Sequence, residues 1–503
     1  MKLYTSSETK KIDRLAIKKK GISAFSLMLK AAEFSFNTIL ENWPNTTKAI
    51  IFCSKGNNTG DGYLLAALLK EAGIQSQIVQ ITKREGLSPA TAKGLRVCKQ
   101  RKVKTIKFSS FKKMKIEKNT ILIDALLGTG LKGNVRKELH QAIEFINKKS
   151  KNYPLLSLDI PSGICADSGT ELGASILADV TTTFVGRKRG CYTSRGKERA
   201  GKVYFNDLLV GKDIFKKVDS SCYILNMEDH LKKINQRNLN THKGHYGHVL
   251  IIGGNTGFGG AAILAAKAAA RSGAGLVSLA TRPEHMNAAL SQCPEIMVKG
   301  VNSGQDLEPF LSQPKVLAIG PGLGQDAWSE QLLQRTLWET KNRNIPIVMD
   351  ADSLNLLPKM NLTSSLPQKI VITPHPGEAS KLLKKTVNEI EIDRFKSVKE
   401  LQKKLKAVVV LKGSGSLVCF NKRGKQMIGV CEAGNPGMAS GGMGDILSGL
   451  IASFIAQGLN VIQATEAAVD IHSKASDLTA MRLGQLGMLA SDVLEDVIDL
   501  LRH

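Results

Sequence analysis

Short apolar runs alternate with glycine-rich turns and amphipathic segments along most of this 503-residue chain. The apolar run at 49–53 (AIIFC) predicts a strand, SKGNNTGDG a loop, and YLLAALLKEAG a helix that ends at Gly73. The segments at 120–134 (TILIDALLGTGLKGN) and 155–163 (LLSLDIPSG) repeat the pattern of a strand that ends in an acid or a glycine turn. Such alternation predicts a parallel sheet with helices on both faces.

A second series of the same kind fills the rest of the chain. From about Asp213 to His242 the sequence is polar and irregular, which predicts a domain boundary near residue 220. Strands are then expected in HVLIIGG, LVSLAT, VLAIGPGLG, IPIVMDADSLN, KIVITPHPGE and AVVVLKGSGS, and a helix in AAILAAKAAARSG. We therefore expect two α/β domains, 1–219 and 220–503. In both, the unusual residues follow strands, where open α/β sheets bind ligands.

Composition narrows the class of protein. A hydrophobic content of 42% and 46 glycines fit a globular fold with many tight turns. No apolar run approaches the roughly 18 residues of a membrane span, and the N-terminus lacks the apolar core of a signal peptide, so a cytoplasmic protein without membrane contact is expected. The eight cysteines form no CxxC pair, which disfavours a zinc site and a disulfide framework.

The formal net charge of +26 has two interpretations. A basic surface can attract nucleic acid or another phosphorylated partner. Alternatively, the lysines are spread over solvated faces, as runs such as KKMKIEK and LQKKLKA suggest. We favour the second interpretation, in which the field helps to draw in an anionic dinucleotide.

The motif GNNTGDG offers groups for an anion at the first strand end. Its glycines allow turns in which backbone amides point at a phosphate, although Asn-Gly and Asp-Gly pairs also occur as simple turns. Asp124 and the DIPSG segment are expected at the same sheet edge, which favours a pocket. The oxygens of Asn58, Asp124 and Ser162 would suit a hard cation, with an ordinary hydrogen-bonded network as the alternative.

The second half carries two further glycine-rich loops. KGSGS at 412–416 follows a strand and could wrap a nucleotide phosphate, to which Lys412 would add charge. In ASGGMGD, Gly441, Gly442 and Gly444 precede Asp445 and an apolar helix whose N-terminus would present free amides. An acid at a helix start is usually only a favourable N-terminal charge. His375, between two prolines at a strand end, is a candidate ligand contact.

Together these motifs resemble the family of bifunctional NAD(P)H-hydrate repair enzymes. The resemblance is carried by GNNTGDG, DALLGTGLKGN, LDIPSG, HKGHYGHVLIIGG, GPGLG, DADSLN, TPHPGE, KGSGS and NPGMASGGMGD, in the family's order and over nearly the whole chain. It implies a Rossmann-like three-layer epimerase domain that interconverts the R and S forms of hydrated NADH or NADPH. It also implies a ribokinase-like dehydratase domain that uses ADP with Mg²⁺ and releases AMP. A homo-oligomer that binds no nucleic acid is expected.

The resemblance also implies site residues. In the epimerase, Asp159 would be catalytic and a potassium ion would be held by Asn58, Asp124 and Ser162. The hydrated dinucleotide would contact Asn57, Asn58, Thr59, Gly60, Asp61, Gly128, Thr129, Gly130, Leu131, Lys132, Gly133, Asn134 and Asp159. In the dehydratase, Asp445 would be catalytic, the hydrate would contact Ala261, Gly322, His375 and Asp445, and the adenine nucleotide would contact Lys412, Gly413, Ser414, Gly415, Ser416 and Gly444.

Two positions depart from the family pattern, and two other functions are alternatives. Thr59 replaces a glycine of GNNGGDG, and Leu29 in LMLKAAE replaces a glutamate. The second half also resembles kinases of vitamin precursors, which phosphorylate an alcohol and stop there. The first half resembles scaffold modules of RNA metabolism, but the sequence lacks the aromatic stacking signatures that RNA-binding modules use.

Overall fold

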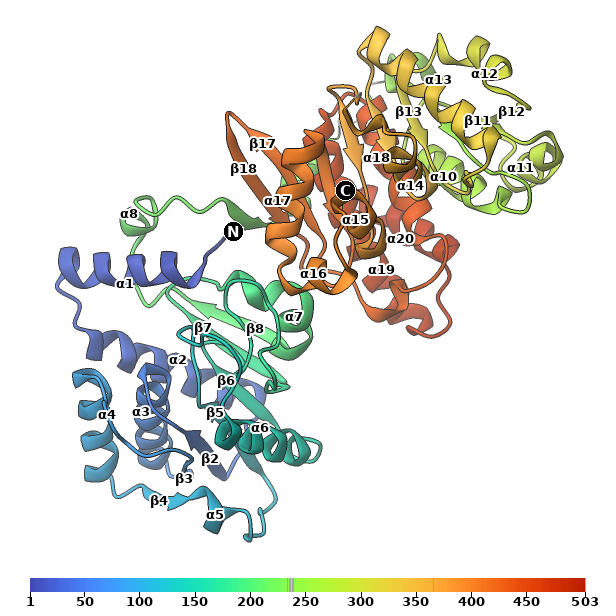
Figure 1. The fold of residues 1–503 in the computed structure, drawn as a ribbon. Coiled ribbons are helices and arrows are strands. Elements are labelled where there is room, and N and C mark those ends of the chain that lie inside the picture. The colour runs from blue at the N-terminus through green and yellow to red at the C-terminus, as the bar shows by residue number, and fades with distance from the viewer. Residues whose placement is uncertain (233, 235–236, 238, 365, 503) are drawn as a thin grey trace. The chain divides into compact units, whose positions relative to one another are not determined.

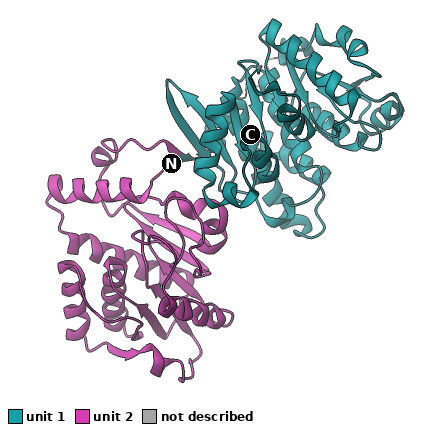
Figure 2. Ribbon diagram, in the orientation of Figure 1, with its two compact units in different colours: residues 1, 223–503 teal, residues 2–222 magenta. Residues whose placement is uncertain are grey.

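The computed structural model describes residues 1–232, 234, 237, 239–364 and 366–502. The chain forms two compact units, one of Lys2–Cys222 and one of Met1 with Tyr223–His503 (Figure 2). Among the described residues, none of the helices has the length and apolar character needed to cross a membrane.

The first unit is built on a parallel seven-stranded sheet in the order β4-β3-β2-β5-β6-β7-β8 (Figure 1). Strand order reverses between β2 and β5, and such a switch point is where doubly wound sheets bind dinucleotides. Its elements are β1 (Lys2–Leu3), α1 (Ser6–Lys20), α2 (Ala24–Asn42), β2 (Lys48–Cys53), α3 (Asn57–Glu71), β3 (Gln75–Gln80), α4 (Pro89–Gln100), β4 (Lys104–Lys107), α5 (Phe108–Phe111), β5 (Thr120–Ala125), α6 (Lys137–Ser150), β6 (Leu155–Leu158), β7 (Val180–Phe184), η1 (Arg189–Tyr192), α7 (Ser194–Ala200), β8 (Lys202–Asn206) and α8 (Lys212–Phe215).

Alternate side chains of this sheet form two separate cores, as the two-residue period of a strand requires. Ile51 packs with α2, α3 and α4 on one face, whereas Ile50 and Phe52 pack with α5 and α6 on the other. The first unit therefore has three layers, and the predicted Rossmann-like architecture is confirmed.

The second unit has a larger mixed sheet, which runs β9-β18-β17-β16-β15-β14-β13-β10-β11-β12. Strands β10 to β16 pair in parallel, and β17 and β18 are antiparallel. Its elements are β9 (Cys222–Ile224), α9 (Met227–Leu231), η2 (Lys243–Tyr246), β10 (His248–Ile252), α10 (Gly259–Arg271), β11 (Leu276–Thr281), η3 (Pro283–His285), α11 (Met286–Gln292), β12 (Met297–Gly300), α12 (Gly304–Leu311), β13 (Val316–Ile319), α13 (Ala327–Arg343), β14 (Ile347–Met349), α14 (Asp352–Lys359), η4 (Leu362–Ser364), β15 (Ile370–Ile372), α15 (Pro376–Leu383), α16 (Val387–Ile392), α17 (Arg394–Leu405), β16 (Val408–Leu411), β17 (Leu417–Lys422), β18 (Lys425–Val430), η5 (Pro436–Met438), α18 (Met443–Ala456), α19 (Val461–Leu483) and α20 (Ala490–Leu501).

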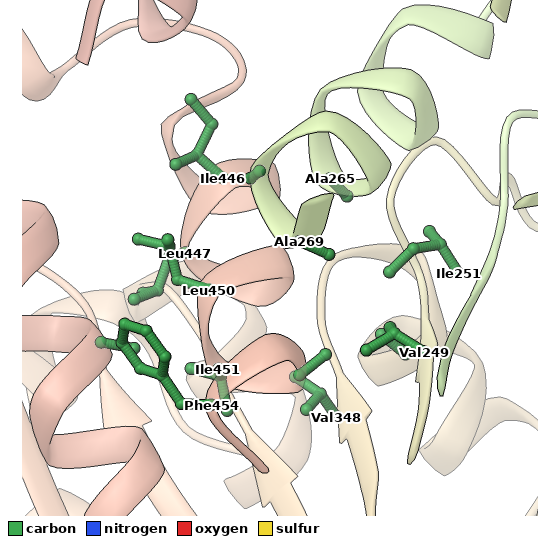
Figure 3. Close-up of a cluster of buried hydrophobic side chains, with 14 of the residues drawn as sticks. Val249, Ile251, Ala265, Ala269, Val348, Ile446, Leu447, Leu450, Ile451 and Phe454 are labelled. Atoms are coloured by element: carbon green, nitrogen blue, oxygen red, sulfur yellow. The ribbon is translucent and has the colours of Figure 1, made fainter. Parts of the chain in front are cut away.

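Close packing of α10 against α18 explains the alanine-rich sequence of α10. Figure 3 shows Ala265 and Ala269 of α10 beside the apolar face of α18, above Val249 and Ile251 of β10. A methyl group added at Gly449 would overlap the Ala265 carbonyl, so the two helices meet at a distance that only small residues allow. The alanines of this helix thus serve packing.

Three boundaries differ from the sequence predictions. The motif GNNTGDG is not a loop ahead of the helix, because α3 already begins at Asn57 and Gly56 takes the turn with φ +104°. Helix α18 begins at Met443, so Gly444 and Asp445 lie in its first turn. The segment predicted to be irregular contains α8, β9 and α9, which are too short to show a clear period in the sequence. Its residues 233, 235–236 and 238 lie outside the described residues.

Candidate functional sites

Glycines of the first motif bring the N-terminus of α3 against its neighbours. A methyl group at Gly60 would lie 2.5 Å from the Met28 side chain, and one at Gly62 would lie 2.6 Å from Ala125 Cβ. Thr59 fits its buried position, since its hydroxyl donates to the Ala125 carbonyl at 2.9 Å and accepts from the Ser54 amide at 3.0 Å. The free amides at the start of α3 are thus fixed at the switch point of the sheet.

A network of oxygen atoms surrounds Asp124, which is fully buried at the end of β5. Its carboxylate accepts hydrogen bonds from the Ser162 hydroxyl at 2.6 Å, the Ser162 amide at 2.8 Å and the Ser157 hydroxyl at 2.9 Å. Burial raises the pKa of Asp124, and these hydrogen bonds oppose that rise.

Asn58 brings an unused acceptor to the same region. Its amide nitrogen donates to the Leu127 carbonyl at 2.9 Å, and Ser162 Oγ also contacts the Leu127 backbone. Within the described chain, Asn58 Oδ1 is buried and has no hydrogen-bond partner. A buried carboxylate beside an unsatisfied amide oxygen fits a hard cation bound by oxygen atoms.

Asp159 and Lys188 form an ion pair after strands β6 and β7. Lys188 Nζ donates to Asp159 Oδ1 and, at 2.7 Å, to the Phe184 carbonyl. The lysine side chain is 2% exposed and that of Asp159 17%, so the pair is largely shielded from water. Asp159 has φ +67°, a left-handed conformation that is uncommon outside glycine. Such backbone strain is often found at functional sites.

Three of the predicted epimerase residues come together around this pair. A methyl group at Gly128 would lie 3.4 Å from Asn58 Cβ and 3.9 Å from Asp159 Oδ2. The rest of the predicted segment, Thr129 to Asn134, forms a half-buried to exposed loop. Asn58, Gly128 and Asp159 therefore line one site.

Two further carboxyl groups, those of Asp61 and Asp13, are affected by the charges of Asp159 and Lys188. Burial and the charge of Asp159 raise the pKa of Asp61 well above its ordinary value, and Lys188 opposes the rise. The pKa of Asp13 is raised to about 6, mainly by burial. The charge of Lys188 opposes this rise, and the charge of Asp159 adds to it. Sequence analysis missed Lys188 and Asp13. Lys188 lies in a cationic run, GRKRG, that resembles a solvated turn, and no motif marks Asp13.

The second site centres on an ion pair beneath the start of α18. Lys412 Nζ lies 2.7 Å from Asp350 Oδ1, and the Ser448 hydroxyl donates to Asp350 Oδ2 at 2.9 Å. A methyl group at Gly444 would lie 3.2 Å from both Lys412 Nζ and Asp350 Oδ2, so this glycine leaves space above the pair. Sequence analysis missed Asp350, although the acids of DADSLN directly follow a buried strand.

Two acids near this pair have raised pKa values. Burial and the charge of Asp350 raise the pKa of Asp445 to about 7, against the opposing charge of Lys412. Burial likewise raises the pKa of Glu378 to about 7. Burial lowers the pKa of Lys412, but the negative charges of Asp350 and Glu378 have the larger effect, so the pKa is raised overall. A buried acid that titrates near neutrality is suited to proton transfer.

His375 is the N-cap of α15 and shares a capping box with Glu378. Its Nδ1 accepts from the Gly377 amide at 3.0 Å, and its backbone amide donates to Glu378 at 2.8 Å. Burial and the nearby charge of Lys412 lower the pKa of His375, which favours a neutral ring. The His375 side chain is 56% exposed, so it can contact a ligand at the rim of the site.

A buried arginine shapes the predicted nucleotide loop at 412–416. Arg394 is 1% exposed, forms an ion pair with Glu391 at 2.6 Å, and donates to the carbonyls of Leu411 and Lys412 at 3.1 Å each. Gly413 has φ +141°, and a methyl group there would lie 2.7 Å from Arg394 Nη1. The loop therefore turns around the guanidinium in a way that only glycine permits.

Ala261 and Gly322, two predicted substrate contacts, also lie together. A methyl group at Gly322, where φ is +58°, would lie 3.2 Å from Ala261 Cβ. The loop that carries Gly322 is joined to the start of α14, since the Gly324 amide donates to Asp352 at 3.0 Å. These contacts link the loops that follow β13 and β14.

Both folds and both sites define a two-centre α/β enzyme that handles nucleotides. Comparison with known proteins identifies the family of this enzyme. Residues 24–190 match the family model described as YjeF-related protein N-terminus, and residues 249–499 match that described as NAD(P)H-hydrate dehydratase. Proteins named bifunctional NAD(P)H-hydrate repair enzyme are 41% identical in Coxiella burnetii (98% of this chain, 97% of the relative) and 38% identical in Vibrio cholerae (99% and 98%). This chain belongs to the family of bifunctional NAD(P)H-hydrate repair enzymes.

A solved structure agrees for the second unit. A ribokinase-like superfamily protein from Enterococcus faecalis is 31% identical, with a TM-score of 0.51, over 56% of this chain and 96% of that chain. The predicted ribokinase-like fold is thereby confirmed. The chain is an enzyme with an NAD(P)H-hydrate epimerase half and an NAD(P)H-hydrate dehydratase half. Family membership decides against the vitamin kinase and the RNA scaffold as the main function.

Proposed function

We propose that the first unit interconverts the R and S epimers of NAD(P)H hydrate, and that the second dehydrates the S epimer with ADP, giving NAD(P)H, AMP and phosphate. The observation that carries this proposal is Asp445, a half-buried acid in the first turn of α18 beside the Lys412–Asp350 pair. We place the enzyme in the cytoplasm and expect a homo-oligomer.

In the dehydratase, Asp445 would accept the proton of the hydroxyl group on C6 of the hydrated ring. The oxygen of that hydroxyl group would attack the terminal phosphorus of ADP. The bond between that phosphorus and the bridging oxygen breaks, and AMP leaves. The ring nitrogen then expels the phosphate from C6, and loss of a C5 proton restores the C5–C6 double bond. Amides at the start of α18 and Lys412 would stabilise the charge of the transferred group.

Magnesium would enter this site with ADP. In the part of the chain that the structure describes, no group of three or more His, Cys, Asp or Glu side chains is arranged to hold a metal ion. Mg²⁺ usually binds proteins through one or two carboxylates together with substrate phosphates and water. When bound, it would neutralise phosphate charge, while the loop at Lys412–Ser416 and Gly444 would hold the nucleotide.

In the epimerase, Asp159 would move the proton that accompanies opening and reclosing of the hydrated ring at C6. Lys188, through its ion pair with Asp159, would orient the carboxylate. Potassium would be held by Asn58, Asp124 and Ser162, where it would neutralise the buried charge of Asp124. The loop at 128–134 and the segment Asn57–Asp61 would hold the dinucleotide.

Replacing Asp445 by Asn tests the dehydratase proposal. We expect ADP-dependent dehydration to fall by about a hundred- to ten-thousandfold, the usual contribution of a general base. Epimerisation in the same preparation should be unchanged and serves as the internal control, because its residues belong to the other unit. Near-normal dehydration by this variant would refute the role of Asp445.

A further inference from the structure

The turn that follows β3 carries hydrogen-bond donors that the fold does not use. Thr82 Oγ1 and Arg84 Nη2 are buried, and neither has a hydrogen-bond partner among the described residues. Both groups can donate, and buried donors are normally satisfied by protein, water or a ligand. Two unsatisfied donors within three residues point to an acceptor that is supplied from outside the chain.

The turn is held firmly in place on its inner side. Arg84 Nε donates to Gln80 Oε1 at 2.9 Å, and the guanidinium lies over the Tyr63 ring at 5.7 Å. Gln80 in turn donates to the carbonyls of Ser54 at 2.6 Å and Thr82 at 3.1 Å. One edge of the Arg84 guanidinium is therefore fixed, which leaves Nη2 for another partner.

The turn also belongs to the dinucleotide site. It continues to Ser88, whose hydroxyl donates to Asn57 Oδ1 at 2.9 Å, in the first turn of α3. Thr91 Oγ1 similarly donates to the Gly56 carbonyl at 3.3 Å. The segment after β3 thus forms a wall beside the glycine-rich motif.

Topology indicates which part of a dinucleotide would reach this wall. The order β4-β3-β2-β5-β6-β7 corresponds to the 3-2-1-4-5-6 order of dinucleotide-binding sheets. In such sheets the adenosine ribose lies at the end of the second strand, which here is β3, whereas Asp159 marks the ring end beyond β6. An acid at that position binds the 2′-hydroxyl of NAD, and an arginine accommodates the 2′-phosphate of NADP.

We propose that Thr82, Lys83 and Arg84 form a subsite for the 2′-phosphate of the adenosine ribose, which makes the epimerase prefer hydrated NADPH to hydrated NADH. Lys83 and Lys55 are exposed and would add positive charge. The one acid in the turn is Glu85, which is also exposed and follows Arg84. The inference rests on the proposed epimerase function of the same site.

Steady-state epimerisation of the R forms of hydrated NADPH and NADH, followed by chromatographic separation of the epimers, tests the subsite. For the wild type we expect kcat/KM to be about ten- to a hundredfold higher for the phosphorylated form, the usual worth of hydrogen bonds to a charged group. Adenosine 2′,5′-bisphosphate should inhibit at lower concentration than adenosine 5′-monophosphate. Equal kcat/KM values and equal inhibition would overturn the subsite, whereas epimerisation of neither hydrate would refute the proposed function instead.

Variants of the turn sharpen the test. Arg84→Gln should raise KM for hydrated NADPH about tenfold or more, with little change in kcat, because the 2′-phosphate is bound equally in ground and transition states. Its kinetics with hydrated NADH should change much less than those with hydrated NADPH, because hydrated NADH has no 2′-phosphate. Lys83→Gln, at an exposed position that should not affect folding, should weaken the preference in the same direction.

Two controls separate the subsite from general effects of charge. Arg101→Gln removes a cation that pairs with Glu71 just beyond the C-terminal end of α4, at the opposite end from Ser88, and should leave the preference unchanged. Glu85→Gln removes the acid and should leave the preference unchanged or raise it. A preference that is lost in Arg101→Gln, or kept in full in both Arg84→Gln and Lys83→Gln, would contradict the proposal.

Discussion

Lys412 Nζ lies 2.7 Å from Asp350 Oδ1 directly below Gly444, the residue that precedes Asp445. The pair places opposite charges next to an acid that must lose its proton before it can act as a base. Asp350 raises the pKa of Asp445 and Lys412 lowers it, with burial as the largest influence. The result is an acid that titrates near neutrality at the N-terminus of α18.

The pH dependence of dehydration should report this acid. Because Asp445 is proposed to act in its ionised form and its pKa is about 7, kcat/KM for dehydration should rise with pH through about 7 and then level off. The measurement is a profile from about pH 5.5 to 8.5 at saturating ADP, with the S epimer as the varied substrate. A profile that is flat across this range would contradict the assignment.

The same acid should make the second unit less stable at high pH. A raised folded-state pKa means that the protonated form stabilises the fold, and this contribution is lost as pH rises through about 7. Asp445→Asn should therefore be more stable than the wild type at about pH 8, by on the order of 1 kcal/mol for each tenfold difference in proton affinity between the folded and unfolded states. Urea unfolding in a Trp43→Phe background, in which Trp328 and Trp338 supply all the tryptophan fluorescence, measures it. At about pH 4 the difference should vanish, and a less stable variant at both values would argue against a buried acid.

Lys188→Met should damage the epimerase and leave the dehydratase intact. The change leaves Asp159 without its cation beside Asp61 and Asp13, and breaking a buried pair in this way typically costs about 3–5 kcal/mol. Epimerisation should fall by about a hundredfold, because Asp159 remains but loses the ion pair that orients it, and proton transfer contributes about a hundred- to ten-thousandfold to the rate. Lys202→Met, which removes an exposed cation from the same unit, is the control. Equal loss in both variants would show that overall charge, not the ion pair, matters.

Gly413→Ala should weaken ADP binding more than a matched glycine substitution. Gly413 has φ +141° and faces Arg394 at 2.7 Å, so a methyl group would both strain the backbone and displace the guanidinium. We expect KM for ADP to rise about tenfold, since such strain costs about 1–3 kcal/mol. Gly424→Ala, with φ +83° and no heavy atom of the described residues within 4 Å of the added carbon, carries only the backbone strain. Similar KM values for ADP in the two variants would contradict the role of the Arg394 contact.

Potassium should stabilise the first unit through Asn58. We expect KCl to raise the midpoint of thermal unfolding by a few degrees over tetramethylammonium chloride at equal concentration, as binding to the folded state requires. Asn58→Leu, which removes the unpartnered buried oxygen, should abolish the difference. A potassium effect that survives in Asn58→Leu would move the ion elsewhere.

Much of the architecture is visible in the sequence because strands and helices differ in period. The apolar runs at 49–53, at the start of 120–134 and at 407–411 become β2, β5 and β16 nearly as predicted. The predicted start of α3 was wrong, because three glycines and two asparagines are typical of loops. In the fold, Gly60 and Gly62 lie too close to Met28 and Ala125 for a larger side chain, so packing favours glycine within this helix. Leu29, where the family has glutamate, packs against the core of the first unit.

Sites are less visible, because pairs of charges form between segments far apart in the chain. Asp445 can be selected from its glycine-rich setting, but Asp350, which raises its pKa, directly follows the distant strand β14. Glu378, in the first turn of α15, is affected by the charges of Lys412 and Asp350 and likewise carries no local signature. Lys188 likewise looks like one of many surface lysines, although it is 2% exposed and bound to Asp159. With 70 lysines and arginines in the chain, the sequence alone does not distinguish the few buried cations from the many exposed ones.

The central claim, two cooperating sites in one chain, is tested most directly by a single time course. Hydrated NADPH containing both epimers is incubated with the enzyme and ADP, and the absorbance of regenerated NADPH is followed. We expect the wild type to convert the whole mixture, Asp159→Ala to convert rapidly only the S fraction, and Asp445→Asn to convert almost none. Full conversion by Asp159→Ala at the wild-type rate, or regeneration of NADPH by Asp445→Asn at a near-normal rate, would contradict this account.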